Sequence, residues 1–132
     1  MIELMVVIVI LGILSALLYP KVPVLLNRAK EGKTKGNLAT LKSTIRIYYS
    51  DNDSFSPIDN LETLIPKYIK QIPECSLPPH HAASTAVTND TTIGDTDEGF
   101  WQYNNDESDT NWGDIWIECS HADSSGAMWS SF

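Results

Sequence analysis

Seventeen consecutive residues without a charge, from Leu4 to Pro20, constrain this chain more than any other part of its sequence. As an α-helix, this segment would be about 26 Å long, which is near the lower limit for crossing the hydrocarbon core of a bilayer. The segment is apolar on every side, so in water its whole surface would have to be covered. The other residues, about 110 of them, can build only one modest core. We therefore expect residues 1–23 to lie in a membrane, in a bundle of identical segments, or in each at different times.

Glu3 stands immediately before the apolar segment. A carboxylate at the edge of an apolar helix is costly unless it has a partner. The next basic residue, Lys21, is too far along a helix to reach it. We expect the partner to be an α-amino group, a lipid headgroup or a group on another subunit. A cleavable secretory signal has its basic residues before the apolar stretch, and here they follow it, which argues against that interpretation.

Charge is divided sharply along the chain, which has a net charge of −8. Residues 1–50 contain seven Lys and Arg and two acids, whereas residues 51–132 contain two Lys and fifteen acids. The acidic half argues against phosphate binding, so we expect no nucleic-acid partner. The basic segment suits anionic lipid headgroups or the acidic half of a neighbouring copy.

Residues 2–14 and Pro20 resemble the N-terminal helix of class III signal proteins, which are the type IV pilins and the pseudopilins of type II secretion. Glu3, Gly12 nine residues later and Pro20 carry the resemblance, which covers about twenty of the 132 residues. It implies a mature chain that begins two residues before Met1 with an N-methylated Phe, after a prepilin peptidase has removed a basic leader. It also implies an assembly ATPase and a platform protein as partners, and a pairing of Glu3 with the N-terminal amine of an adjacent subunit.

The long helix is weakened between residues 12 and 23 by Gly12, Pro20 and Pro23. Each proline lacks a backbone donor and clashes with the preceding turn. In assembled pili of the resembling family this region is partly extended, and the additional Pro23 leads us to expect extended chain here. A simple kink at Pro20 is the alternative.

The fold class that we predict is α+β, with a long N-terminal α-helix packed by a small antiparallel β-sheet domain. After the apolar segment (residues 1–23) we expect a head domain (24–132). It would comprise a spine helix (24–52), a loop region (53–98) with a short helix at 61–65, and antiparallel strands (99–132) formed by the aromatic and β-branched runs 99–104 and 114–120. An apolar stripe at helical spacing should attach the spine helix to the rest of the head. This stripe consists of Leu38, Leu41, Ile45 and Tyr48.

Cys75 and Cys119 predict one disulfide if the domain is exported, whereas two buried thiols would fit a cytosolic chain. Three histidines could join a thiol in a metal site, but their spacing matches no pattern of metal ligands, so we predict no such site. The histidines are His80, His81 and His121.

Acidic and amide side chains in the second half offer oxygen ligands for Ca²⁺, and major pseudopilins of the resembling family have a calcium-binding C-terminal loop. The spacing of an EF-hand is absent, and a solvated acidic loop is the alternative. The candidates are Asp95, Asp97, Asp106, Asp109 and Asp114. We expect no other cofactor.

The chain contains no GxxxxGK[ST], GxGxxG, HExxH or CxxC motif. These observations and the family resemblance predict a structural protein rather than an enzyme, namely the major subunit of a type IV pilus. The subunit would reside in the bacterial inner membrane as a precursor and then be incorporated into an extracellular filament. One alternative is a pseudopilin in a periplasmic pseudopilus. The other is a membrane-anchored secreted binding module or adhesin.

Overall fold

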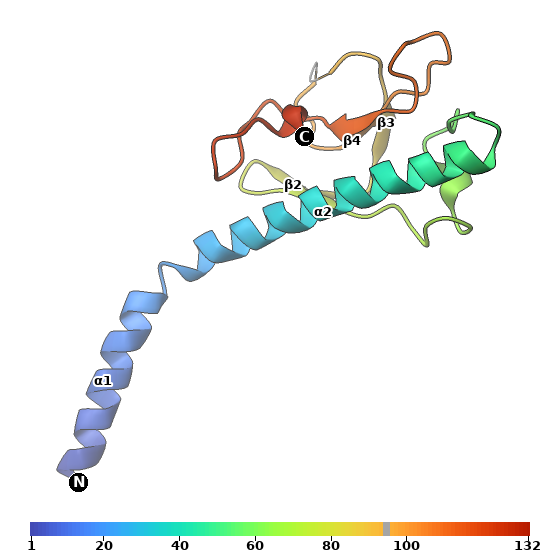
Figure 1. The fold of residues 1–132 in the computed structure, drawn as a ribbon. Helices are drawn as coiled ribbons and strands as arrows, with labels where there is room; N and C mark the ends of the chain where they lie inside the picture. Colours follow the sequence, from blue (N-terminus) through green and yellow to red (C-terminus); the bar gives the residue numbers. More distant parts are fainter. Residues whose placement is uncertain (94–95) are drawn as a thin grey trace.

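The computed structural model describes residues 1–93 and 96–132. A bent helical rod leads into a small head made of the second helix, short strands and loops (Figure 1). The predicted α+β class is therefore confirmed. The elements are α1 (Ile2–Leu18), α2 (Val22–Asp51), η1 (Glu62–Leu64), β1 (Cys75–Leu77), β2 (His81–Ser84), β3 (Val87–Asn89), β4 (Trp101–Tyr103), β5 (Ile115–Ile117) and η2 (Trp129–Ser131).

The helical rod breaks between α1 and α2, at residues 19–21. Helix α1 continues through Gly12 to Leu18, and α2 begins at Val22, with a bend of 45° between the two helices. Our expectation of extended chain over residues 12–23 is therefore wrong, and the alternative of a kink is the one that the chain adopts.

The two prolines explain why the break is so short. Pro20 cannot donate a helical hydrogen bond, and the chain turns tightly here, with the Lys21 N–H donating to the Leu18 carbonyl at 3.0 Å. Pro23 falls in the first turn of α2, where the N–H that it lacks would have no intrahelical partner. Pro23 therefore starts a helix instead of extending the break.

The predicted apolar stripe of α2 is confirmed. Its three aliphatic side chains are buried in the core, and its tyrosine is half-buried against that core; they are Leu38, Leu41, Ile45 and Tyr48. On the same face, the Thr34 hydroxyl donates to the Ser76 carbonyl at 2.8 Å and accepts from the Ser76 N–H at 3.0 Å. This pair of bonds fixes strand β1 along the middle of α2.

The predicted antiparallel hairpin in the second half is also confirmed. Strands β4 and β5 pair antiparallel, with Trp101 opposite Ile117 and Tyr103 opposite Ile115. All four side chains are buried, as expected for aromatic and β-branched residues on a sheet that packs on a helix.

Our prediction of a loop over residues 53–98 is wrong in part, because β1, β2 and β3 lie within it. Strands β1 and β2 form an antiparallel pair, and β3 pairs parallel with β4. The sheet β3–β4–β5 is therefore mixed and not purely antiparallel. The helix expected at 61–65 is only the 3₁₀ turn η1, since Leu61 is left-handed (φ 67°) and Pro66 follows.

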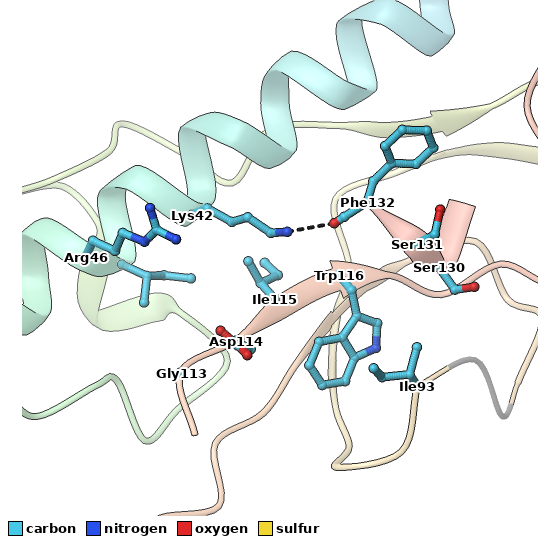
Figure 2. Close-up of a pocket in the computed structure, with 11 residues that line it drawn as sticks. Lys42, Arg46, Ile93, Gly113, Asp114, Ile115, Trp116, Ser130, Ser131 and Phe132 are labelled. Atoms are coloured by element: carbon cyan, nitrogen blue, oxygen red, sulfur yellow. Dashed lines mark hydrogen bonds between the residues drawn. The ribbon is translucent and has the colours of Figure 1, made fainter. Parts of the chain in front are cut away.

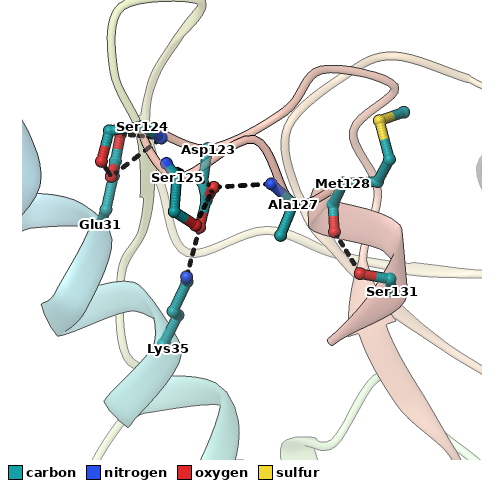
Figure 3. Close-up of polar contacts among 8 residues, drawn as sticks. All are labelled: Glu31, Lys35, Asp123, Ser124, Ser125, Ala127, Met128 and Ser131. Atoms are coloured by element: carbon teal, nitrogen blue, oxygen red, sulfur yellow. Dashed lines mark hydrogen bonds and ion pairs between the residues drawn. The ribbon is translucent and has the colours of Figure 1, made fainter.

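The C-terminal segment, residues 119–132, returns to α2. Figure 3 shows Lys35 and Glu31 of the helix facing Asp123 and Ser124 of this segment. The Lys35 ammonium forms an ion pair with Asp123, and the Ser124 hydroxyl donates to the Glu31 carboxylate at 2.5 Å. Charged groups of the helix therefore fasten the last part of the chain to the head.

Candidate functional site

Helix α1 is exposed on all of its faces. None of its residues is buried, and side chains such as Leu4 and Ile8 are 68% and 63% exposed. The apolar surface continues past the bend to Leu25 and Leu26, and we call residues 1–26 the apolar rod. In Figure 1 its α1 part projects away from the head. By length and composition, no single helix among the described residues qualifies as a membrane span, whereas α1 and α2 do when they are taken together across their bend.

Glu3 lies in the first turn of α1 and is exposed. A carboxylate at this end of a helix is favoured by the helix dipole, but no cation in residues 1–93 or 96–132 is within ion-pair distance of it. Gly12 lies further along the same rod, and a Cβ built on it would meet nothing within 4 Å. Neither residue is explained by contacts inside the single chain.

Both cysteines are buried. Cys75 and Cys119 are free thiols in this structure, so the expected disulfide stays a prediction. Burial raises the pKa of Cys75 to about 12, and the neighbouring Cys119 sulfur adds to the rise. Both thiols belong to the buried core of the head.

A second group of side chains comes together beside Cys119, and we call it the His–Cys–Asp cluster: His81, Asp97, Cys119 and His121. One ligand atom from each of the four lies within 4.8 Å of the others. His81 comes from β2, Asp97 from the loop before β4, and the other two from the segment after β5. The ring of His80 stacks on that of His121, with 3.8 Å between the ring centroids.

Asp97 lies at the centre of the cluster. Its carboxylate is 3.2 Å from His81 Nε2 and 3.3 Å from His121 Nδ1, and it accepts a hydrogen bond of 2.9 Å from the Ser120 N–H. That hydrogen bond lowers the pKa of Asp97 to about 2, helped by the two imidazoles and opposed by burial. The Sγ of Cys119 is 3.5 Å from His121 Nδ1.

The other calcium candidates do not converge within the described part of the chain. Asp106 Oδ1 accepts from the Ser108 N–H at 2.8 Å, and Asp109 Oδ1 accepts from the Asn111 N–H at 2.7 Å, so each stabilises its own turn. Asp114 belongs to neither turn, and Asp95 lies outside the described residues. The chain thus groups Asp97 with imidazoles and a thiol, and not with the other carboxylates.

A pocket of about 250 Å³ lies between α2 and the C-terminal segment (Figure 2). Lys42 Nζ donates to the Phe132 carbonyl oxygen at 2.6 Å on one side of it, and Arg46 and Asp114 also line it. Its volume is below the usual range for ligand pockets, about 300–1,000 Å³. We assign it no function.

Comparison of the chain with protein-family models, with curated proteins and with solved structures gives no match in any of the three. Function is therefore inferred from the residues of the chain itself. Two features of interest stand out: the apolar rod with Glu3 near its tip, and the His–Cys–Asp cluster at the side of the head.

Proposed function

We propose that the chain is a structural subunit of a type IV pilus-like filament, assembled through its apolar rod. The observation that carries this proposal is the exposure of α1 on every face. Apolar surface in contact with water costs about 25 cal/mol per Å², so a helix of this kind is stable only when lipid or other protein covers it. A membrane and a bundle of identical rods meet the same requirement, and a subunit can pass from the first to the second.

Glu3 supplies register in this proposal. A carboxylate carried into an apolar bundle without a partner is strongly destabilising. Pairing with the N-terminal amine of the adjacent subunit removes that cost at one axial offset between rods and not at others. Gly12 also contributes to register, because a residue without a side chain allows a neighbouring helix to approach closely at that position.

The other partners follow from the resemblance of the N-terminal segment. A prepilin peptidase would mature the chain in the bacterial inner membrane, and an assembly ATPase with its platform protein would move subunits from the membrane into the filament. The acidic head would face the solvent, where the filament meets its surroundings.

The test is to image filaments made by cells that express the wild-type chain or Glu3→Gln, which keeps the size of the side chain and removes its charge. We expect filaments from the wild-type chain and few or none from Glu3→Gln, with equal amounts of both subunits in the membrane. Glu107→Gln, the same change at an exposed position of the head, is the matched control and should assemble normally.

Two results would contradict the proposal. Filaments of normal number and length from Glu3→Gln would remove the role of Glu3. Full-length wild-type protein that is monomeric and dispersed in water without detergent would remove the filament function altogether, since the apolar rod would then need no cover.

A further inference from the structure

The His–Cys–Asp cluster at the side of the head has the composition and spacing of a metal site. We propose that His81, Asp97, Cys119 and His121 together bind one Zn²⁺ ion. This proposal is independent of filament assembly, because the four residues all belong to the head.

The spacing of the ligand atoms fits a tetrahedral zinc ion. Zinc bonds of about 2.0–2.3 Å give a tetrahedron with edges of about 3.3–3.8 Å. His81 Nε2 is 3.2 Å from Asp97 Oδ1, His121 Nδ1 is 3.3 Å from the other oxygen, Oδ2, and Cys119 Sγ is 3.5 Å from His121 Nδ1. With one ligand atom taken from each residue, the four atoms lie within 4.8 Å of one another. Small side-chain adjustments around a central ion would bring these edges to their bonded lengths.

The chemistry of the donor set selects the metal. Two imidazoles, one thiolate and one carboxylate are ligands of Zn²⁺, whereas Ca²⁺ and Mg²⁺ prefer oxygen alone. The charges balance, since the Asp97 carboxylate and the Cys119 thiolate together neutralise the two positive charges of the ion. On binding, the thiol proton of Cys119 passes to the solvent and a zinc–sulfur bond forms, with no change of oxidation state.

Backbone groups around the cluster hold its side chains in place. The Ser120 N–H donates to Asp97 at 2.9 Å, and the His121 N–H lies 3.4 Å from Cys119 Sγ. The Trp129 N–H donates to the His121 carbonyl at 3.2 Å, which ties this ligand to the C-terminal segment. Such partners orient metal ligands and raise metal affinity.

A glycine makes room for one of the imidazoles. Gly99 has a φ of +76°, and a Cβ at this position would lie 2.5 Å from Cγ of His81. The side chain of His81 is 15% exposed and that of Asp97 is 38% exposed, so an ion can reach the cluster from solvent.

Bound zinc would join three segments that are distant in sequence. His81 belongs to the β1–β2 pair, Asp97 precedes β4, and Cys119 follows β5. The ion would therefore connect the small sheet to the mixed sheet and stabilise the head. It requires Cys119 as a free thiol, so zinc binding and a Cys75–Cys119 disulfide are alternative states of one sulfur atom.

The test measures zinc bound to full-length protein in detergent, with a phosphine reductant present and unbound metal removed by gel filtration. We expect one zinc per chain and a higher melting temperature for the zinc-loaded wild type.

Four variants test which residues bind the ion. Cys75→Ser keeps all four ligands and cannot form the disulfide, so it should also bind one zinc. Asp97→Asn and Cys119→Ser should weaken zinc binding by more than about tenfold, since changes to outer partners alone cost 10–100-fold. Asp106→Asn, which removes a carboxylate that also accepts a backbone N–H, is the matched control and should bind like the wild type.

Cobalt provides a readout that needs no variant. Co²⁺ in the wild-type site should give the strong visible bands of a tetrahedral ion and the near-ultraviolet band of a cobalt–thiolate bond. Wild-type protein that binds no zinc, unchanged affinity in Asp97→Asn and Cys119→Ser, or a cobalt complex without the thiolate band would each overturn the proposal.

Discussion

At the scale of single residues, Asp123 explains how the end of the chain is held. Its side chain is 1% exposed and pairs with Lys35, while Oδ1 accepts from the Ser125 and Ala127 N–H groups at 2.8 and 2.9 Å. The hydrogen bond from Lys35, followed by those from the Ser125 side chain and the backbone, holds the pKa of this carboxyl well below its usual range. One carboxylate thus orders its own loop and attaches it to α2.

This shift makes stability depend on pH. Because the pKa of Asp123 is lower in the folded chain than in the unfolded chain, the group stabilises the fold above the unfolded pKa of about 3.9, and the effect is lost as the pH falls from there toward the folded pKa. We expect Asp123→Asn to have a lower melting temperature than the wild type at pH 7. The difference in melting temperature between the two proteins should become smaller as the pH is lowered below about 4. Melting curves of both proteins from pH 7 to pH 2 measure it, and a difference that is independent of pH would contradict this account.

Gly99 allows a second prediction at the same scale. Gly99→Ala should lower the free energy of unfolding because the new Cβ meets the ring of His81. Gly126→Ala is the matched control, since its φ of +89° imposes similar backbone strain but a Cβ there meets nothing within 4 Å. We expect Gly99→Ala to cost about 1–3 kcal/mol more than Gly126→Ala, the usual range for overpacking. Urea unfolding of the two variants gives the comparison, and equal costs would show that His81 moves aside freely.

At the scale of elements, the joint between α1 and α2 is determined by its prolines. Pro20 lacks the N–H that would otherwise donate to the Ala16 carbonyl. Pro20→Ala should restore that hydrogen bond and reduce the 45° bend. The distance between spin labels at the exposed positions Val9 and Ile47 should therefore increase.

Pro23→Ala is the control for this measurement. Pro23 lies in the first turn of α2, so its replacement restores no intrahelical bond and should leave the distance between the labels unchanged. An unchanged distance in Pro20→Ala would mean that the bend is set by contacts other than the missing hydrogen bond.

The elements that could be predicted from sequence are those specified locally. The stripe of α2 recurs at helical spacing, and the aromatic and β-branched runs around Trp101 and Trp116 favour strands, so both were recognisable. Strands β1 and β3 are as short as β4 and β5, but their residues, Cys75–Leu77 and Val87–Asn89, include no aromatic side chain and lie among polar and proline residues, so nothing local marks them as strands. The parallel pairing of β3 with β4 depends on contacts between distant segments, about which local sequence carries no information.

The sequence suggests a metal site of histidines and a thiol, but we rejected it on spacing, and Asp97 was grouped with the calcium candidates instead. Metal motifs are recognised by fixed spacing within one segment, and here His81 and Cys119 are brought together only by the packing of two sheets. The one local signal was the pair Cys119 and His121, two residues apart at the end of a predicted strand. The exposed rod, by contrast, was evident from sequence because an unbroken apolar run needs no tertiary information.

At the scale of the whole molecule, two of the basic side chains of α2 form ion pairs within the chain. Lys33 pairs with Glu74 at 2.8 Å, and Lys35 pairs with Asp123. The helix thereby neutralises part of the acidic head that it supports. In the proposed filament, the acidic half of a neighbouring copy would therefore meet fewer unpaired cations on α2 than the division of charge along the sequence indicates.

The separation of α1 from the head has a consequence for how such a chain can vary. Since no side chain of α1 is buried, substitutions in the head need no matching substitutions there. Under the proposed filament function, α1 would contact lipid and the α1 helices of other copies, whereas the head would face the solvent. The surface of the head could then change while α1 stays the same, and hybrid chains that join another head to this α1 should still assemble with the wild type.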